Sequence, residues 1–301
     1  MISKRYSVMA VLSAGLCCAV ASATEFWITD GPDLWRVDSE RGEIEWLGTL
    51  PVGGDAVLEI ALAPDGRLYG LAGSILYLID PLKVSAEVIG ALETQSIVSG
   101  LAFASDGTLY GLQWNNFFYE IDPETAETVL LDQVGIPVST HTLDIDAAGD
   151  AYAPGFDPFN SEFLYRIDLD TLEVDITFVP MPDLISAMVF DDEGNLFAVD
   201  GGQSNSLFII DPVSGESQVV MSLAPLDDIE GIEIIPQQPP CPGDANGDGM
   251  VDTRDSGYIA ARFGCSVGTG EPDCDVADQN ADGIVNPLDV GFVLARFGIC
   301  P

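Results

Sequence analysis

The sequence predicts an all-β fold of about five repeated four-stranded units, followed by a small helical domain. Three observations support this prediction. A strand-like segment ending in Asp recurs through residues 24–235, a Pro- and Gln-rich segment interrupts the pattern at 236–240, and two matching Asp-rich segments follow within 241–301. We therefore expect two domains joined by a short, extended, semi-rigid linker.

The first repeated element is an apolar segment that ends in Asp. Its five copies are LWRVD, LYLIDP, FYEIDP, LYRIDL and LFIIDP, and their Asp residues are Asp38, Asp80, Asp122, Asp168 and Asp211. These Asp residues are spaced by 42, 42, 46 and 43 positions. Asp at the first position of a turn and Pro at the second favour a tight turn after a strand.

The second repeated element alternates with the first. Its copies are IALAPDGRLYGL, LAFASDGTLYGL, LDIDAAGDAYAP and MVFDDEGNLFAV, with central glycines at Gly66, Gly107, Gly149 and Gly194. Glycine between two apolar runs is typical of a hairpin, because glycine accepts a positive φ. Together the two elements give four strands in each repeat, which predicts the blades of a β-propeller.

The two ends of the repeat region complement each other. Residues 25–50 form a repeat that lacks its first strand, and residues 231–235, Gly-Ile-Glu-Ile-Ile, have the pattern of that missing strand. A blade shared between both ends would close the ring and gives a count of five. A degenerate sixth blade and a tandem β-sandwich are the alternatives.

The N-terminus has the features of a secretory signal peptide over residues 1–23. Lys4 and Arg5 precede an apolar stretch at 8–20, and Ala21-Ser22-Ala23 supplies a cleavage pattern. The stretch is short for a membrane span. We expect a secreted protein, extracellular or at the cell surface, with the periplasm as the alternative location.

The net charge narrows the choice of partners. Ten Lys and Arg residues stand against 49 Asp and Glu residues, which gives a formal net charge of -39. Such a surface repels phosphate backbones and anionic lipids, so we expect neither nucleic acid nor a membrane surface as partner. It favours the binding of cations.

Two 12-residue segments match each other at an offset of 34, DANGDGMVDTRD at 244–255 and DQNADGIVNPLD at 278–289. Calcium takes six to eight oxygen ligands, which such a loop can supply from positions 1, 3, 5, 7, 9 and 12, with glycine at position 6 for the turn. Gly249 and Gly283 occupy position 6. The predicted ligands are Asp244, Asn246, Asp248, Met250, Asp252 and Asp255, then Asp278, Asn280, Asp282, Ile284, Asn286 and Asp289.

A single helix is expected after each loop. Pro239, Pro240 and Pro242 exclude a helix before the first loop, and position 12 is Asp where an EF-hand has Glu. The helices should begin near Thr253 and Pro287 and run to about Phe263 and Phe297, each ending in Ala-Arg-Phe-Gly. We expect a small shared core of Ile259, Phe263, Val293 and Phe297.

The duplicated loop and its apolar helix resemble the dockerin family over about a fifth of the chain. The resemblance implies calcium-dependent folding with two Ca²⁺ ions and docking onto a cohesin-like or other exported protein. In that family, loop positions 10 and 11 help to select the partner. These positions hold Thr253-Arg254 and Pro287-Leu288, which differ from each other and from the Ser-Thr pair of the best-known cellulosomal dockerins. Arg262 and Arg296 are further candidate contacts with a partner.

Four cysteines follow the predicted cleavage site: Cys241, Cys265, Cys274 and Cys300. An even number in a small exported domain indicates two disulfides, with three pairings to choose from. If the two helices are antiparallel, the end of each helix approaches the start of the other loop, which favours Cys265–Cys274 and Cys241–Cys300. A zinc site is the weaker reading, because the spacing is not C-x-x-C.

The repeat region offers few candidates for catalysis. Aligning the repeats places Glu59, Gly100, Thr142, Ala187 and Gly231 in one layer of the ring, and the weak catalytic candidates are Glu59, His141, Asp228 and Glu230. No G-x-S-x-G segment occurs, and His141 is the single histidine. We expect a non-catalytic binding scaffold. The alternative is a hydrolase or lyase acting on polysaccharide, or a lactonase, with its site in the channel.

Overall fold

The computed structural model describes residues 5–7, 24–136, 142–156, 159, 161–181, 184–201, 205–236, 243, 245, 250–266, 274, 277–280 and 283–299. The chain divides into two compact units, Met1–Ile235 and Pro236–Pro301. Within the described residues, no helix is both long enough and apolar enough to cross a membrane.

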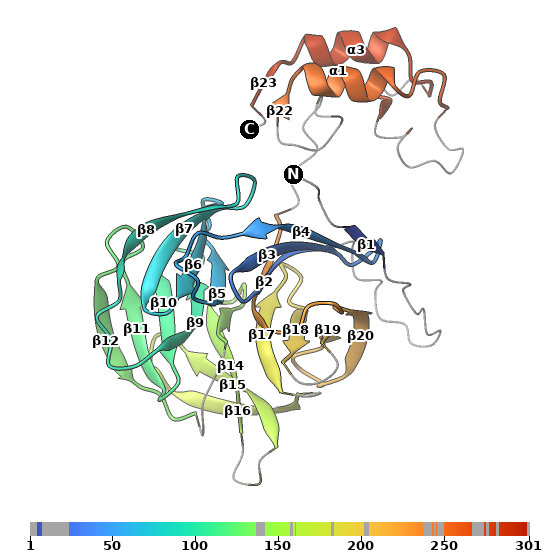
Figure 1. The fold of residues 1–301 in the computed structure, drawn as a ribbon. Coiled ribbons are helices and arrows are strands. Elements are labelled where there is room, and N and C mark those ends of the chain that lie inside the picture. Colours follow the sequence, from blue (N-terminus) through green and yellow to red (C-terminus); the bar gives the residue numbers. More distant parts are fainter. Residues whose placement is uncertain are drawn as a thin grey trace. The chain divides into compact units, whose positions relative to one another are not determined.

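The first unit is a β-propeller of five antiparallel blades, which confirms the propeller part of the predicted fold (Figure 1). Neither a sixth blade nor a β-sandwich occurs among the described residues. Four blades use consecutive strands, in these groups: β5 (Val57–Leu62), β6 (Leu68–Ala72), β7 (Ile75–Asp80) and β8 (Ser85–Ala91); β9 (Val98–Phe103), β10 (Leu109–Gln113), β11 (Phe117–Ile121) and β12 (Thr128–Gln133); β13 (Asp144–Ile145), β14 (Asp150–Phe156), β15 (Glu162–Asp168) and β16 (Val174–Pro180); β17 (Ile185–Phe190), β18 (Leu196–Asp200), β19 (Ser206–Ile210) and β20 (Ser217–Ser222).

The fifth blade joins the two ends of the unit, as the sequence predicts. Strand β21 (Ile229–Ile234) pairs antiparallel with β2 (Glu25–Asp30), which continues into β3 (Asp33–Asp38) and β4 (Glu43–Thr49). Strand β1 (Arg5–Ser7), from the predicted signal peptide, pairs with the outer edge of β4. Because residues some 200 positions apart share one sheet, the ring closes only when both ends have folded.

The repeated Asp residues hold the turns after the third strand of each blade. Each accepts backbone N–H groups from the residues two and three positions further on, at 2.8–3.2 Å. These bonds favour the ionised carboxylate and hold the pKa of Asp122, Asp168 and Asp211 below its usual value. In the four blades made of consecutive strands, the turn after the inner strand places a glycine at positive φ, for example Gly107 at +92°.

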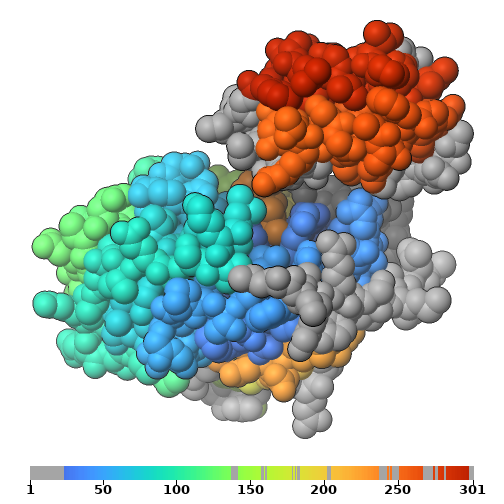
Figure 2. All heavy atoms as spheres, turned by 45° about the horizontal axis from the view of Figure 1, so that its top comes forward, coloured from blue at the N-terminus to red at the C-terminus, as the bar shows by residue number. Residues whose placement is uncertain are grey.

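Side chains fill the space between neighbouring blades. In the junction of the last blade and the shared blade, the rings of Phe26 and Phe197 meet edge to face at 5.0 Å, and both side chains are fully or almost fully buried. Figure 2 shows the blue and teal atoms of the first blades forming a continuous surface. Five buried apolar clusters each join residues of two neighbouring blades, so burial of apolar side chains between blades is the main stabilising contribution in the described part of this unit.

The second unit contains two helices, α1 (Thr253–Ala260) and α3 (Pro287–Leu294), and a short pairing of β22 (Met250–Val251) with β23 (Gly298–Ile299). Both helices begin where the sequence predicts. The predicted ends are wrong by three residues. The N–H groups of Arg262 and Arg296 bond to carbonyls three residues back, which tightens and ends the last turn.

The core of the second unit differs from the predicted one. Ile259 and Val293 are fully buried as expected. The prediction for Phe263 and Phe297 is wrong, because both lie past the helix ends and are 47% exposed. Their places in the core are taken by small residues of the loops and short strands, namely Ala245, Val251, Ala277 and Val285.

Candidate metal centre and the propeller axis

The second Asp-rich loop is folded around its own carboxylates. Asp278, at position 1, accepts the N–H of Gly283 at 2.7 Å. Gly283, at position 6, has φ +90°, a conformation that favours glycine. The residue types that calcium loops place at these positions are thus accommodated by the backbone of this loop.

The closing residue of each loop ties the start of the loop to the following helix. Asp289 is fully buried, and its two oxygens accept the N–H groups of Asn280, at 3.1 Å, and Asn286, at 2.8 Å. Asp255 is buried to the same extent and accepts the N–H groups of Ala245, at 2.8 Å, and Asp252, at 2.7 Å. A similar arrangement therefore recurs 34 residues further on, with the N–H donated from loop position 2 in the first copy and from position 3 in the second.

Position 9 begins each helix. The side chains of Asp252 and Asn286 are the N-caps of α1 and α3, and with Asp255 and Asp289 they form two capping boxes. The carboxylates of Asp255 and Asp289, in the first turn of each helix, are also favoured by the positive end of the helix dipole. This gives a physical reason for Asp at position 12, because that residue must reach both the loop and the first helical turn.

The predicted ligands fall into two groups. Asp244, Asn246, Asp248 and Asp282 lie outside the described residues. Those described are Met250, Asp252, Asp255, Asp278, Asn280, Ile284, Asn286 and Asp289. Across the described part of the chain, no three acidic, His or Cys side chains converge closely enough to hold a metal ion. The donor set is nevertheless made of oxygens alone, the chemistry that calcium prefers.

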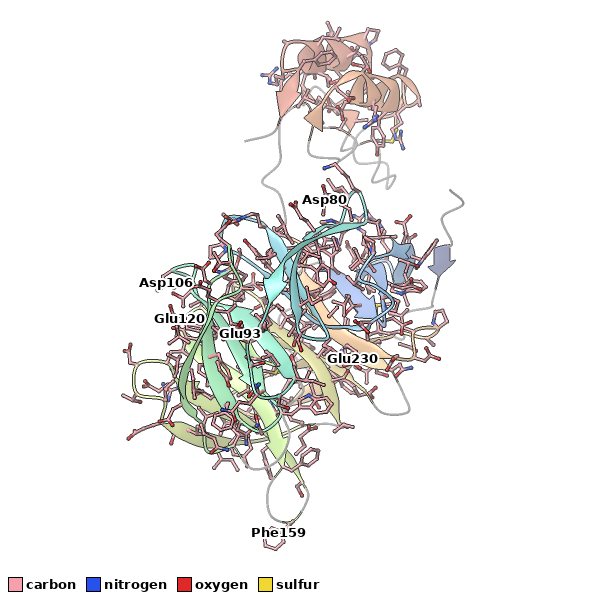
Figure 3. All side chains as sticks on the ribbon, turned by 60° about the vertical axis from the view of Figure 1, so that its left-hand side comes forward. Asp80, Glu93, Asp106, Glu120, Phe159 and Glu230 are labelled. Atoms are coloured by element: carbon pink, nitrogen blue, oxygen red, sulfur yellow. A yellow bond between two sulfur atoms is a disulfide. The ribbon has the colours of Figure 1, made fainter. Side chains whose placement is uncertain are left out.

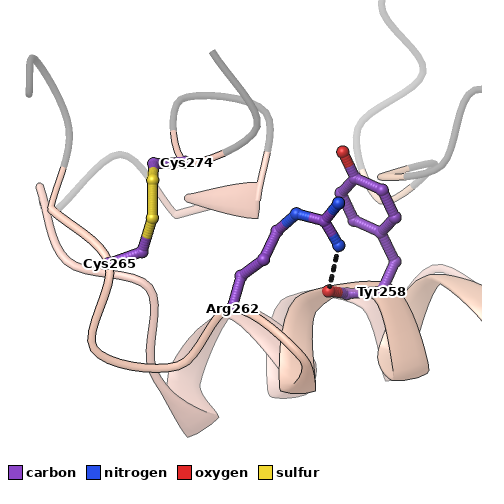
Figure 4. Close-up of a disulfide and its surroundings, with 4 residues drawn as sticks. All are labelled: Tyr258, Arg262, Cys265 and Cys274. Atoms are coloured by element: carbon purple, nitrogen blue, oxygen red, sulfur yellow. Dashed lines mark hydrogen bonds between the residues drawn. A yellow bond between two sulfur atoms is a disulfide. The ribbon is translucent and has the colours of Figure 1, made fainter. Parts of the chain in front are cut away.

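A disulfide joins Cys265, after α1, to Cys274, one of the two pairings that the antiparallel argument favours (Figure 4). Their Cα atoms are 5.7 Å apart, and Cys274 is almost fully buried. Cys241 and Cys300 lie outside the described residues. The bond fixes the chain after α1 to the segment that leads into the second loop.

An arginine lies over an aromatic ring at the end of each helix. The guanidinium of Arg262 lies 3.5 Å from the ring centre of Tyr258 and donates to the Tyr258 carbonyl (Figure 4). Arg296 repeats this arrangement on Phe292, at 3.4 Å.

The other predicted partner contacts are all exposed, namely Thr253, Arg254, Pro287 and Leu288.

The strand register confirms most of the layer predicted inside the ring. Glu59, Gly100, Ala187 and Gly231 pair with the equivalent residue of the second strand in their blades, Leu71, Leu112, Val199 and Thr29. The glycines allow close approach of the inner strands. A Cβ on Gly231 would lie 3.0 Å from the nitrogen of Ile60.

The weak catalytic candidates are spread over different surroundings. Glu59 is 1% exposed, and burial raises the pKa of its carboxyl well above the usual value. Burial and the nearby Asp228 raise the pKa of Glu230 to about 7. Figure 3 shows Glu230 on an inner strand, well apart from Asp106 in a turn. His141 lies outside the described residues.

Two further acidic residues near Glu59 were not among the predicted candidates. Asp144 on β13 and Glu233 on β21 pair with Tyr152 and Trp27, and the equivalent inner-strand residues in the other blades are Ala61, Ala102 and Val189. The signal that could have found them is a charged residue in an otherwise apolar column of the repeat. Burial raises the pKa of both carboxyls.

No protein-family model and no curated protein sequence matches the chain. Among solved structures, a chain of a nidogen/laminin complex is similar with a TM-score of 0.54 and 13% identity, over 72% of this chain and all of that one. A protein of unknown function from Bacteroides thetaiotaomicron has a TM-score of 0.50 and 16% identity, over 72% of this chain and 64% of that one. TolB from Acinetobacter baumannii has a TM-score of 0.46 and 16% identity, over 67% and 53%. These similarities concern the fold alone.

Proposed function

We propose that this protein is an exported propeller that acts as a binding scaffold and carries a calcium-dependent docking domain at residues 241–301. The observation that supports the docking domain is the duplication. In both copies a buried Asp at position 12 accepts one N–H from the start of its loop and one from the position-9 residue.

Two calcium ions would bind, one in each loop. Asp244, Asn246, Asp248, Asp252, Asp255 and the carbonyl of Met250 would hold the first ion, and Asp278, Asn280, Asp282, Asn286, Asp289 and the carbonyl of Ile284 the second. A bound ion would balance the carboxylates gathered in each loop, and its binding energy would contribute to folding. The small apolar core of this unit makes such a contribution important.

The partner would meet the helix faces next to the loops. Thr253, Arg254, Pro287 and Leu288 lie at the two helix starts, and Leu288 is 68% exposed. The dockerin resemblance supports a cohesin-like or other exported protein as partner. For the propeller, the fold supports binding of a ligand or protein.

Calorimetric titration of the full chain with Ca²⁺, after chelator has been removed, tests the proposal. We expect two ions per chain in the unaltered protein and one in Asp289→Asn, because the amide removes the charge that closes the second loop. Asp192→Asn, an exposed carboxylate in the propeller, is the matched control and should keep both ions. Absence of calcium binding to the unaltered chain would refute the docking domain as proposed.

A further inference from the structure

Asp144 and Glu233 each bridge a junction between blades. The carboxylate of Asp144, on β13, accepts the N–H of Phe190 on β17 at 2.5 Å. That of Glu233, on β21, accepts the N–H of Leu62 on β5 at 2.8 Å and the N–H of Ile234 at 2.9 Å. Within the described part of the propeller, no strand pairs with the axial edge of β5 or β17, so the two carboxylates satisfy backbone donors at these edges.

The second of these bridges lies where the ring closes. Strand β21 comes from the end of the propeller sequence and completes the blade that begins with β2. Leu62 belongs to the next blade, so Glu233 connects the closing strand to its neighbour. Whether the Glu233 carboxyl is protonated or ionised therefore affects the stability of the closed ring.

The groups that face this pair are acidic. The charges of Asp144 and Glu233 raise the pKa of Glu59, on β5, after the larger effect of its burial, and the charge of Asp146 raises the pKa of Asp144. Glu59 Oε2 is buried and has no hydrogen-bond partner among the described residues. The ion pairs that the described part of the propeller contains join Arg36, Arg41, Arg67, Lys83 and Arg166 to other carboxylates.

Asp144 and Glu233 are partly buried, and carboxylates withdrawn from water in this way without a nearby cation are costly in the ionised form. We propose that Asp144 and Glu233 form a pH-sensitive latch at the propeller axis, in which proton uptake stabilises the closed ring. Protonation removes the repulsion within the acidic group and leaves carboxyl oxygens that still face the backbone donors of the next blade.

The direction of the pH effect follows from burial. Both carboxyls have a pKa raised by burial, and for Glu233 the charge of Asp144 raises it further. A raised folded-state pKa stabilises the folded protein below the unfolded-state pKa, and this contribution is lost as the pH rises through the folded-state value. The propeller should therefore be most stable in mild acid and weaken towards alkaline pH.

Tryptophan fluorescence isolates the propeller in the full chain. All four tryptophans, Trp27, Trp35, Trp46 and Trp114, belong to the first unit. Thermal unfolding followed by this signal, between about pH 5 and about pH 9, should give a midpoint that falls with rising pH by an amount on the order of 5 °C. The series is run with excess chelator and again with excess Ca²⁺.

Five variants, two at the axis and three controls, show which groups cause the dependence of the unfolding midpoint on pH. Asp144→Asn and Glu233→Gln should each flatten it, since each removes one charge from the coupled pair. Glu87→Gln and Asp192→Asn, both exposed, should leave it unchanged. His141→Gln should also leave the slope unchanged, because the slope arises from the Asp144 and Glu233 carboxyls.

Several outcomes would overturn the proposal. A midpoint that is constant or rises with pH in the unaltered chain contradicts it, even if a variant fails to fold. A slope that persists in both axial variants, or that disappears in His141→Gln, assigns the titration to other groups. A slope that Ca²⁺ abolishes would make the axis a cation site instead of a latch operated by protons.

Discussion

The propeller and the C-terminal unit hold their chains together in different ways. The propeller buries apolar side chains between five blades and closes its ring by pairing β21 with β2. The C-terminal unit has a core of six buried small or branched residues, two capped helices and a disulfide between Cys265 and Cys274. A large repeated fold can rely on packing, whereas a unit of this size depends on added constraints.

The largest expected effect concerns the propeller axis. Gly231→Val would place a Cβ 2.8 Å from Thr29 Oγ1 and 3.0 Å from the Ile60 nitrogen. The backbones of β21 and β5 would then have to move apart. We expect a loss of about 3 kcal/mol in the free energy of unfolding, measured by urea unfolding with tryptophan fluorescence.

Gly135→Val is the matched control for this substitution. A Cβ there would meet none of the described residues within 4 Å, so the free energy of unfolding should stay close to that of the unaltered chain. Equal stability of the two variants would show that the inner strands do not limit the packing of the ring.

A smaller effect is expected from the disulfide of the C-terminal unit. Replacing Cys265 and Cys274 together by Ser opens a loop of nine residues and should cost about 2 kcal/mol. Calorimetry in excess Ca²⁺ should show the loss in a transition that tryptophan fluorescence does not follow. If the double variant unfolds at the temperature of the unaltered chain, the constraint is not what stabilises this unit.

The propeller could be predicted from the sequence because its repeats are local patterns. Asp80 and Asp122 mark equivalent turns, and Gly66 and Gly107 mark equivalent hairpins, so spacing alone gives the blades and their order. The closing strand could be predicted for the same reason. Each blade needs four strands, and within the repeat region only its first and last segments lacked the full set.

The parts that were missed depend on contacts between distant residues. Phe263 and Phe297 follow apolar helical patterns, but the helices end before them and the loops supply the core instead. Asp144 and Glu233 stand out in the aligned repeats as charged residues in an apolar column, but the backbone groups of other blades that they bind are visible only in the fold. The calcium ligands themselves remain a prediction, and half of the first loop's side chains lie outside the described residues.

Thermal unfolding of the full chain with and without chelator tests the contrast between the two units most directly. Calorimetry reports both units, and tryptophan fluorescence reports the propeller alone. We predict that chelator lowers the calorimetric transition of the C-terminal unit by at least about 10 °C and leaves the fluorescence transition in place. Identical calorimetric traces with and without chelator, or an equal shift of the fluorescence transition, would contradict this account.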